Sequence, residues 1–367
     1  MRYTLLGRTG LRVSQFCLGT ANFGEDWSGG ASKEVCADIV ETFVEAGGNF
    51  IDTANFYTNG TAEQLLGDLV SGDRGHFVLG TKYTLQTRPG DVNAAGNHRK
   101  NLVDALESSL QRLRTDYIDL YWVHVRDAFT PVEEIMRALD DQVRRGKVLY
   151  AGVSNWPAWE IAHANTLAEL RAWSPFVGLE TQYNLLERTP ERDLLPMARA
   201  FELTVLAWGA LAQGVLTRAG GSSPAQAAAS GQPDEVCGRD VLVREDMRVR
   251  AERVVPALVA IAREGGWTPA QVALAWLRTR PGPVIPILGV SSRGQLRENL
   301  GSMDVRLDDP QLRRLDEVSR VDEGFPHDFL RDEQVKQLAH GDAWRRIDHQ
   351  RARAVATELS RPQPPAP

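Results

Sequence analysis

The chain of 367 residues is 43% hydrophobic and 25% charged, so it can bury a large core in one large α/β domain or two smaller ones. Its net charge of −6 does not favour a nucleic-acid-binding face, which needs clustered positive charge, so nucleic acid is not an expected partner. Three widely spaced cysteines, Cys17, Cys36 and Cys237, argue against a disulfide framework and a zinc cluster.

The N-terminus lacks a hydrophobic signal region, and no uninterrupted apolar stretch is long enough to span a bilayer. We therefore expect a cytoplasmic protein without a membrane partner. A reducing compartment also suits the sparse cysteines.

The first residues predict a β-hairpin over residues 3–13, followed by a first core strand over residues 13–18 that ends in Gly19 and Thr20. Ser32 is a suitable N-cap for the helix that comes next. From there strands and helices alternate regularly along the chain. The predicted core strands are residues 13–18, 50–52, 77–82, 118–124, 148–154, 177–182, 204–208 and 284–289.

Two later helices have strong start signals. Thr130 is a suitable N-cap, Pro131 fits the first helical position, and Glu133 would close a capping box. Thr268 and Gln271 have the spacing of a second capping box, at the start of a later helix. Eight strands, each followed by helix, predict a (β/α)8 barrel, an α/β fold whose active site lies at the mouth formed by the C-terminal ends of the strands.

Residues 1–330 are expected to form one barrel domain with the hairpin at its start. The interval between residues 208 and 284 is unusually long and includes 219–238, rich in Gly, Ser, Ala and Pro, which we expect to be a mobile loop able to close over a ligand. Residues 331–367 read as a polar, helical C-terminal extension with a proline-rich end that we expect to be disordered.

Three consecutive strands end in residues with chemical capability. By strand parity, Asp52, Lys82 and His124 would each point to the same face as the preceding core positions of their strands. Taken singly, Asp52 could cap the next loop, Lys82 could be a solvated strand end, and His124 could be a core histidine with its hydrogen bonds satisfied. Because they occupy equivalent positions on adjacent strands, we expect them, with Tyr57 from the loop after Asp52, to converge at the barrel mouth.

Such a cluster suits the reduction of a carbonyl group. A phenol with a pKa of about 10 is a poor acid at neutral pH, but the Lys82 cation would stabilise the phenolate and Asp52 would keep that lysine charged. Tyr57 would then donate a proton to a developing alkoxide, and His124 could bind the same oxygen. We expect no metal, because these residues lack a metal-ligand spacing.

A phosphate site is predicted after the last strand. No G-x-G-x-x-G motif follows the first strand, which excludes a Rossmann unit. Residues 289–295 instead open a helix with free N–H groups and the cation of Arg293. The alternative is that Ser292 and Gln295 only form a capping box.

Over residues 3–321 the chain resembles the aldo-keto reductase superfamily. The motifs that carry the resemblance are Asp52-Thr53-Ala54 with Tyr57, Gly60 and residues 63–67, Gly80-Thr81-Lys82, residues 116–121 leading to His124, residues 152–155, residues 182–186, and residues 289–295 with Glu298 and Asn299. The resemblance implies that Asp52, Tyr57, Lys82 and His124 form a catalytic tetrad with Tyr57 as proton donor. It also implies NADPH, with NADH less favoured, bound in an extended form across the mouth.

The resemblance further assigns residues to the cofactor. It implies a carboxamide-binding pair, Ser154 and Asn155, and a stacking ring, Trp208. The remaining implied positions are Gly19, Thr20, Leu211 and Gly214, then Gly289, Ser291, Gln295, Glu298 and Asn299 at the adenosine end, with Arg293 facing the 2′-phosphate.

Two positions depart from the family pattern. Glu180 stands where glutamine is usual; a carboxylate can accept from a carboxamide but would repel a phosphate, which puts its cofactor role in question. Gly209 and Ala210, also in the cofactor segment, stand where Ser-Pro is common.

The substrate is expected to be a small carbonyl compound. Trp27, Phe56 and Trp156, beside Tyr57 and His124, could form an aromatic pocket for an apolar aldehyde or ketone, although each aromatic could instead be packing and a sugar-derived carbonyl is an alternative. Two other functions stay open: a lyase that forms a Schiff base on Lys82, and a nucleotide-holding regulatory subunit. The sequence does not indicate an oligomeric state.

Overall fold

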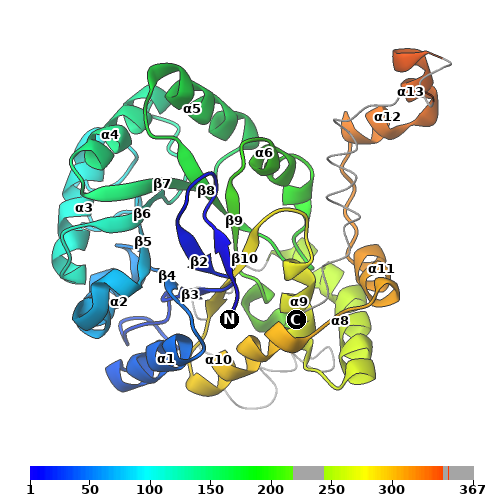
Figure 1. The fold of residues 1–367 in the computed structure, drawn as a ribbon, viewed down its shortest axis with the longest axis horizontal. Coiled ribbons are helices and arrows are strands. Elements are labelled where there is room, and N and C mark those ends of the chain that lie inside the picture. The colour runs from blue at the N-terminus through cyan, green and yellow to red at the C-terminus, as the bar shows by residue number, and fades with distance from the viewer. Residues whose placement is uncertain (218–243, 342–345, 347–367) are drawn as a thin grey trace.

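The computed structural model describes residues 1–217, 244–341 and 346. Its centre is a closed barrel of parallel strands in the order β10-β3-β4-β5-β6-β7-β8-β9 (Figure 1). The predicted (β/α)8 barrel is therefore confirmed. The barrel strands are β3 (Cys17–Gly19), β4 (Phe50–Asp52), β5 (Val78–Tyr83), β6 (Ile118–Val123), β7 (Val148–Ser154), β8 (Phe176–Gln182), β9 (Thr204–Trp208) and β10 (Val284–Gly289).

Helices surround the barrel, and α12 and α13 stand to one side of it (Figure 1). Of the extension predicted over residues 331–367, the part that the structure describes contains the helix Glu333–His340, which confirms its helical character there. The described α-helices are α1 (Lys33–Glu45), α2 (Thr61–Val70), α3 (Arg99–Leu113), α4 (Val132–Arg144), α5 (Ala158–Arg171), α6 (Leu194–Ala200), α8 (Glu245–Gly265), α9 (Pro269–Arg278), α10 (Arg293–Leu300), α11 (Asp309–Val318), α12 (His327–Arg331) and α13 (Glu333–His340).

Trp122 fills the interior of the barrel, and three glycines make room for it. A Cβ atom added at Gly80, Gly152 or Gly178 would lie 2.9, 2.3 or 3.0 Å from the nearest atom of the Trp122 side chain. Gly80 lies on β5, Gly152 on β7 and Gly178 on β8. The absence of side chains at these three positions, on β5 and β7 beside the Trp122 strand and on β8 beyond, lets one large ring occupy the core at this level.

The N-terminal hairpin is confirmed, with β1 (Tyr3–Leu5) antiparallel to β2 (Arg12–Ser14). The predicted first core strand over residues 13–18 is wrong, because the chain bends between β2 and β3. The Ser14 N–H donates to Asn49 Oδ1 at 2.8 Å, and the Ser14 hydroxyl donates to the Phe16 carbonyl at 2.7 Å. These bonds satisfy the bend, so residues 13 and 18 belong to different sheets.

The helix caps follow the prediction in two cases of three. Ser32 accepts from the Val35 N–H at the start of α1, and Thr268 forms a complete capping box at the start of α9. The capping box predicted for α4 is wrong. Pro131 is the N-cap without a side-chain bond, because the Thr130 hydroxyl donates instead to Asp127 Oδ2 at 2.6 Å.

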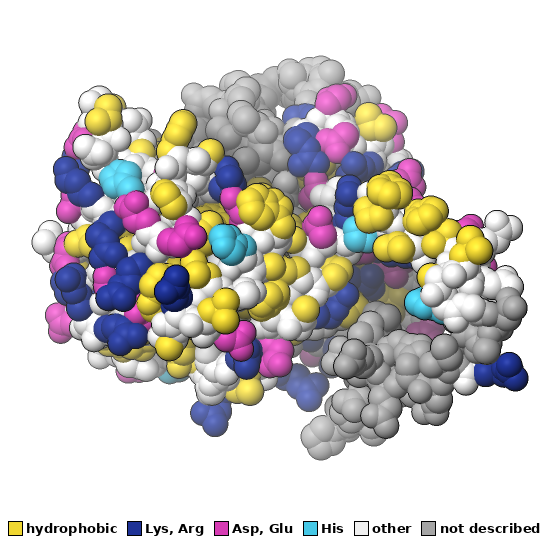
Figure 2. Space-filling model, turned by 90° about the horizontal axis from the view of Figure 1, so that it is seen from above, with side chains coloured by type: hydrophobic (Ala, Val, Ile, Leu, Met, Phe, Trp, Pro, Cys, Tyr) yellow, Lys and Arg dark blue, Asp and Glu magenta, His cyan; other side chains and the backbone are white. Residues whose placement is uncertain are grey.

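Some expectations fall outside the described residues, namely the loop over residues 219–238 and the proline-rich end of the chain. Among the helices that the structure describes, none combines the length and the apolar character needed to cross a bilayer. Basic and acidic side chains are interspersed on the face shown in Figure 2, so that face presents both signs of charge.

Candidate active site

Strand register brings the predicted residues to one rim. Asp52 at the end of β4 pairs with Gly80 on β5, and Lys82, two residues further along β5, pairs with Trp122 on β6. His124 follows β6, and Tyr57 opens the short 3-10 helix Tyr57–Gly60 after β4. All four therefore lie at the barrel mouth.

The ammonium group of Lys82 is the centre of this site. Its side chain is fully buried and forms an ion pair with Asp52. Its Nζ atom also donates to the Thr53 carbonyl at 3.1 Å and to the Tyr57 hydroxyl at 3.4 Å. A second carboxylate, that of Glu180 on β8, lies 3.4 Å from the same nitrogen. Four oxygen atoms from two strands and the loop after β4 thus surround one cation.

The surroundings hold Lys82 in its charged form. Burial opposes the charge, but the carboxylates of Asp52 and Glu180 outweigh it and raise the pKa of Lys82 well above its usual value. A Schiff base requires the neutral amine. The charge on Lys82 therefore argues against a lyase that uses this residue as a nucleophile.

The phenol of Tyr57 is held protonated in this structure. Burial raises its pKa, Lys82 works in the opposite direction, and the charges of Asp52 and Glu180 reinforce the increase. From the sequence we expected Lys82 to lower the pKa of the phenol. Burial and the two carboxylates outweigh the lysine, so the pKa of Tyr57 is raised instead. A protonated phenol remains a suitable donor to an alkoxide, which is a far stronger base.

His124 is a neutral imidazole beside the phenol. Burial, and then the charge of Lys82, lower its pKa well below the usual value. Its ring meets the ring of Tyr57 edge-on, with centroids 6.0 Å apart and planes at 84°. Within the part of the chain that the structure describes, its Nδ1 atom is buried without a hydrogen-bond partner. A neutral ring can donate a hydrogen bond to a substrate oxygen without transferring charge.

Asn155 joins three strand ends at the mouth. Its side-chain nitrogen donates to the His124 carbonyl and to the Ser154 hydroxyl, each at 2.9 Å. Its side-chain oxygen accepts from the indole N–H of Trp208 at 3.1 Å. Asn155 adopts a left-handed backbone with φ of 56°, which turns its amide toward these partners. The partly exposed ring of Trp208 is thereby held beside Ser154 and Asn155.

Glu180 is the site residue whose contact sequence reasoning missed. It was considered as an acceptor for a carboxamide that would repel a phosphate, and its contact with Lys82 was not predicted. Burial, with a contribution from Asp52, raises the pKa of Glu180 to about 8. Alternation along β8 offered a signal, because Gly178, Glu180 and Gln182 share one face and Gly178 packs on Trp122 inside the barrel.

The predicted phosphate end is ordered by its own hydrogen bonds. Ser292 caps α10 by accepting from the Gln295 N–H at 3.2 Å, so the cap is present. Gln295 Oε1 accepts from the Ser291 N–H at 2.8 Å. Asn22, which the sequence did not single out, donates to the Val290 carbonyl at 3.3 Å and to the Ser291 hydroxyl at 3.2 Å. The loop after β3 is thereby tied to the loop that follows Gly289, the last residue of β10.

Arg293 is only loosely paired. Its side chain is 38% exposed, and its guanidinium lies 3.9 Å from the carboxylate of Glu45. Its Nε atom has no hydrogen-bond partner among the described residues. On the same helix Asn299 is buried, whereas Glu298 is exposed and its backbone carbonyl accepts from Gln271 at 3.1 Å. Arg293 therefore retains donors that an anion could use.

The segment after β9 turns sharply. Gly209 and Gly214 have φ of 63° and 86°, and the Gly209 carbonyl accepts from Asn184 Nδ2 at 2.9 Å. Ala210 is buried and Leu211 is partly buried. The glycine in place of serine therefore fits a left-handed turn that a residue with a side chain rarely adopts.

Gly19 and Thr20 are explained by packing. A Cβ atom at Gly19 would lie 2.7 Å from Ile287, and the Thr20 N–H and hydroxyl both donate to the Asp52 carbonyl. They hold β3 against β4 and β10 at the rim. The structure thus gives them a role in positioning Asp52.

Two of the three predicted pocket aromatics lie together. Trp27 is 5.4 Å from Phe56 and 6.4 Å from Tyr57, measured between ring centroids. Trp156 does not join them, because it is 4% exposed and packs edge-on against Phe176 at 6.1 Å. The sequence shows that Trp156 follows the end of a strand. It does not show that the side chain packs among the residues between the barrel and the helices.

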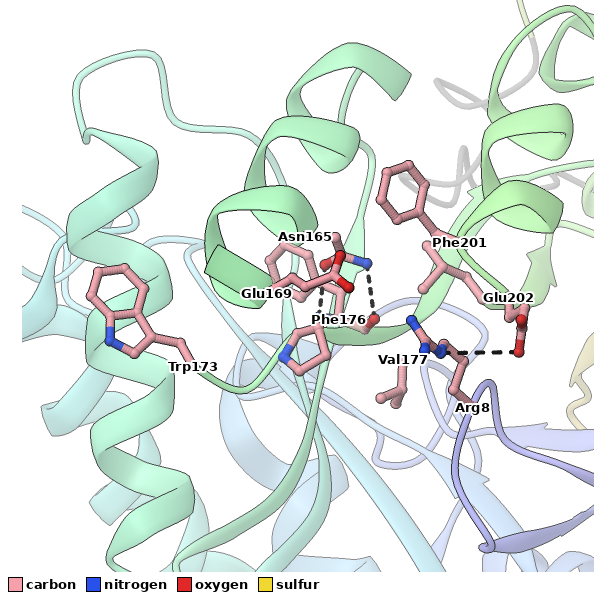
Figure 3. A pocket seen from close by; sticks show the side chains of 10 residues that line it. Arg8, Asn165, Glu169, Trp173, Phe176, Val177, Phe201 and Glu202 are labelled. Atoms are coloured by element: carbon pink, nitrogen blue, oxygen red, sulfur yellow. Dashed lines mark hydrogen bonds and ion pairs between the residues drawn. The ribbon is translucent and has the colours of Figure 1, made fainter. Parts of the chain in front are cut away.

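A separate hollow of about 260 Å³ lies at the opposite end of the barrel, beside Arg8 of the hairpin turn (Figure 3). Asn165 within it is engaged with the backbone of Phe176 at 2.9 and 3.1 Å. Arg8 lies 4.0 Å from Glu202. None of the predicted site residues lines this hollow.

A model of the Aldo/keto reductase family matches residues 15–320. This chain belongs to the aldo/keto reductase family. Norsolorinic acid reductase stcV of Emericella nidulans is 34% identical over 369 residues, which cover 98% of this chain and 92% of that protein. Aryl-alcohol dehydrogenase [NADP(+)] of Phanerodontia chrysosporium is 33% identical over 349 residues, which cover 90% and 89% respectively. As an aldo/keto reductase, the chain is an oxidoreductase of carbonyl compounds.

The residues present fit the nicotinamide cofactor of an aldo/keto reductase. At the tetrad, Ser154, Asn155 and the partly exposed ring of Trp208 offer polar groups and an aromatic face. At the start of α10, Arg293 keeps a buried Nε donor without a partner in the described residues. A dinucleotide needs both kinds of group, a surface for its ring and a cation for its phosphate.

Proposed function

We propose that this aldo/keto reductase uses NADPH to reduce an aromatic aldehyde or ketone to the alcohol, with Tyr57 as the proton donor. One observation carries the proposal: the buried Lys82 ammonium, paired with Asp52, lies 3.4 Å from the Tyr57 hydroxyl at the barrel mouth, and His124 lies beside that phenol. This arrangement provides a proton, a means to stabilise the phenolate and a second donor for the carbonyl oxygen.

When bound, the reduced nicotinamide supplies the hydride that the carbonyl carbon accepts. The chain's own residues handle the oxygen. The O–H bond of Tyr57 breaks as its proton passes to the developing alkoxide, and Lys82 stabilises the phenolate left behind. Asp52 keeps Lys82 charged and oriented. Neutral His124 donates a hydrogen bond to the same oxygen and orients the carbonyl. Hydride and proton together convert the carbonyl to an alcohol.

The cofactor preference is proposed from Arg293. Ser154, Asn155 and Trp208 would hold the nicotinamide end, and Gly289, Ser291 and Gln295 the adenosine end. The guanidinium of Arg293, loosely paired with Glu45, would bind the 2′-phosphate that distinguishes NADPH from NADH. The named NADP(+) relative supports this preference.

The substrate class is proposed from the rings around the phenol. Trp27 and Phe56 form an aromatic wall next to Tyr57, and flat aromatic ligands stack favourably on such walls. The relative named aryl-alcohol dehydrogenase supports a substrate with an aryl group.

The proposal is tested by titrating the purified protein with NADPH and NADH while following tryptophan fluorescence, then measuring NADPH oxidation with matched aryl and alkyl aldehydes. We expect tighter binding of NADPH, and turnover that is faster with the aryl compounds. Nucleotide binding without turnover across the panel would instead favour a regulatory subunit. A borohydride-trapped adduct on Lys82 without nucleotide would favour a lyase.

A further inference from the structure

Glu180 is a buried acid at the active site that the proposed tetrad does not use. It lies on β8, while Lys82 lies on β5, and two strands separate them in the barrel. The two side chains therefore approach each other across the interior, with Glu180 Oε2 3.4 Å from Lys82 Nζ. Both side chains are withdrawn from solvent, being 4% and 0% exposed.

Glu180 competes with three other acceptors for the hydrogens of Lys82. An ammonium group has three donors, and those of Lys82 are engaged by Asp52, the Thr53 carbonyl and the Tyr57 hydroxyl. Among the described residues, Glu180 Oε2 has no hydrogen-bond partner. An ionised Glu180 would thus place a charged oxygen, Oε2, in the interior without the hydrogen bond that normally compensates it.

We propose that Glu180 is a positioning residue that acts on Tyr57 through Lys82, and that the gain or loss of its own proton switches the site between two charge states. The inference rests on the proposed function, since Tyr57 must be the proton donor for that switch to matter. It assigns Glu180 a role other than contact with the cofactor.

The charge balance around Lys82 explains the switch. The titratable groups facing it are Asp52, Tyr57, His124, Glu180 and Cys17 of β3. Burial lowers the pKa of His124 and raises the pKa of Cys17, so both are neutral and Lys82 is the cation of the group. With Glu180 protonated, Lys82 and Asp52 balance. With Glu180 ionised, one negative charge is in excess.

That excess charge acts against the phenolate. Glu180 adds to the rise in the pKa of Tyr57, so its ionisation makes Tyr57 retain its proton more strongly. The pKa of about 8 for Glu180 lies where an enzyme can be assayed. The ionised state would keep the proton donor loaded in mildly alkaline solution and disfavour the reverse reaction, alcohol oxidation, which needs the phenolate.

The first test observes Glu180 directly, with no cofactor or substrate. The protein is labelled with ¹³C at the glutamate side-chain carboxyl carbons and titrated by NMR. We expect one signal with a midpoint near pH 8 that is missing in Glu180→Gln. If every glutamate signal titrates in the usual acidic range, the proposal is wrong.

The second test is the pH profile of kcat/KM for carbonyl reduction. In Glu180→Gln the alkaline fall in activity should shift toward acid by about one unit, because the phenol loses its proton more easily without the neighbouring charge. The Kd for NADPH should be unchanged. Glu169→Gln, which removes the same charge at the other end of the barrel, is the control and should keep the wild-type profile.

The two proposals fail in different ways. An unshifted profile with a changed NADPH Kd would show that Glu180 binds cofactor and would contradict the inference while leaving the reductase function intact. A wild-type protein without turnover would contradict the function, and the NMR titration would still decide whether Glu180 holds the proton.

Discussion

The Lys82 ammonium lies 3.4 Å from the Tyr57 hydroxyl oxygen and 5.1 Å from the centre of the Tyr57 ring. The cation therefore faces both the acidic oxygen and the ring that carries it. A phenolate formed at this position would be stabilised by the adjacent charge at the moment the proton leaves. The first prediction concerns this pair.

Replacing Tyr57 with phenylalanine should leave NADPH binding within twofold and reduce kcat by about 10² to 10⁴, the usual contribution of a general acid. The ring is retained, so packing against Trp27 and His124 should survive. Fluorescence titration and steady-state assays measure the two quantities. Tyr3→Phe removes an exposed phenol in the hairpin and is the control. Wild-type turnover in Tyr57→Phe would remove Tyr57 from the proposed role.

Replacing Arg293 with alanine should weaken NADPH far more than NADH, because NADH lacks the 2′-phosphate. A charge-assisted contact of about 1.5–3 kcal/mol corresponds to a loss of roughly 10- to 100-fold in the NADPH affinity. Arg297→Ala, exposed on the same helix, should change neither Kd. Equal losses for the two nucleotides in Arg293→Ala would contradict the assignment.

Replacing Trp27 with alanine should raise KM for aryl aldehydes several-fold and affect small alkyl aldehydes less. The reason is that removal of this ring opens the aromatic wall that it forms with Phe56. Trp159→Ala deletes an indole that is 66% exposed on α5 and should have no effect on either KM. A uniform change for aryl and alkyl substrates would argue against an aryl-selective pocket.

Introducing a methyl group at Gly152 should destabilise the barrel. The new Cβ would lie 2.3 Å from the Trp122 ring, and overpacking of a tight core costs about 1–3 kcal/mol. Denaturant unfolding measures the free energy. Gly72→Ala, where the added atom would meet nothing within 4 Å, is the matched change. An unchanged free energy of unfolding in Gly152→Ala would show that Trp122 can move aside.

Glu180→Gln should change the pH dependence of stability. The pKa of Glu180 is about 8 in the folded chain, above the value of about 4.3 for an exposed glutamate, so the folded state binds the extra proton. Stability from this group is therefore full below about pH 4 and is lost as pH rises toward 8. Between pH 5 and 9 the variant should gain at least about 1.4 kcal/mol relative to wild type, the equivalent of one pKa unit.

Thermal or denaturant unfolding of both proteins across that pH range measures the difference. Glu169→Gln serves again as the control, because Glu169 is exposed. A constant difference between wild type and Glu180→Gln at all pH values would mean that Glu180 ionises normally in the folded protein.

The sequence by itself determined the barrel and predicted that Asp52, Tyr57, Lys82 and His124 meet at its mouth. Alternating strands and helices are local patterns, and strand parity relates Asp52, Lys82 and His124 because adjacent parallel strands end at one rim. Local signals also predicted the cap at Ser32 and the capping box at Thr268. They failed at Thr130, since its hydroxyl is engaged by Asp127, whose position depends on the loop fold.

Only the tertiary structure decided the electrostatics of the site. Barrel closure brings Glu180 to Lys82 from a strand nearly a hundred residues further along the chain, and no local pattern encodes that approach. It also withdraws the partly buried side chain of Tyr57 from water, which raises the pKa of its phenol, and turns Trp156 away from Trp27 and Phe56. Side-chain direction and desolvation depend on which distant segments pack together, so they follow from the closed barrel and not from the order of residues.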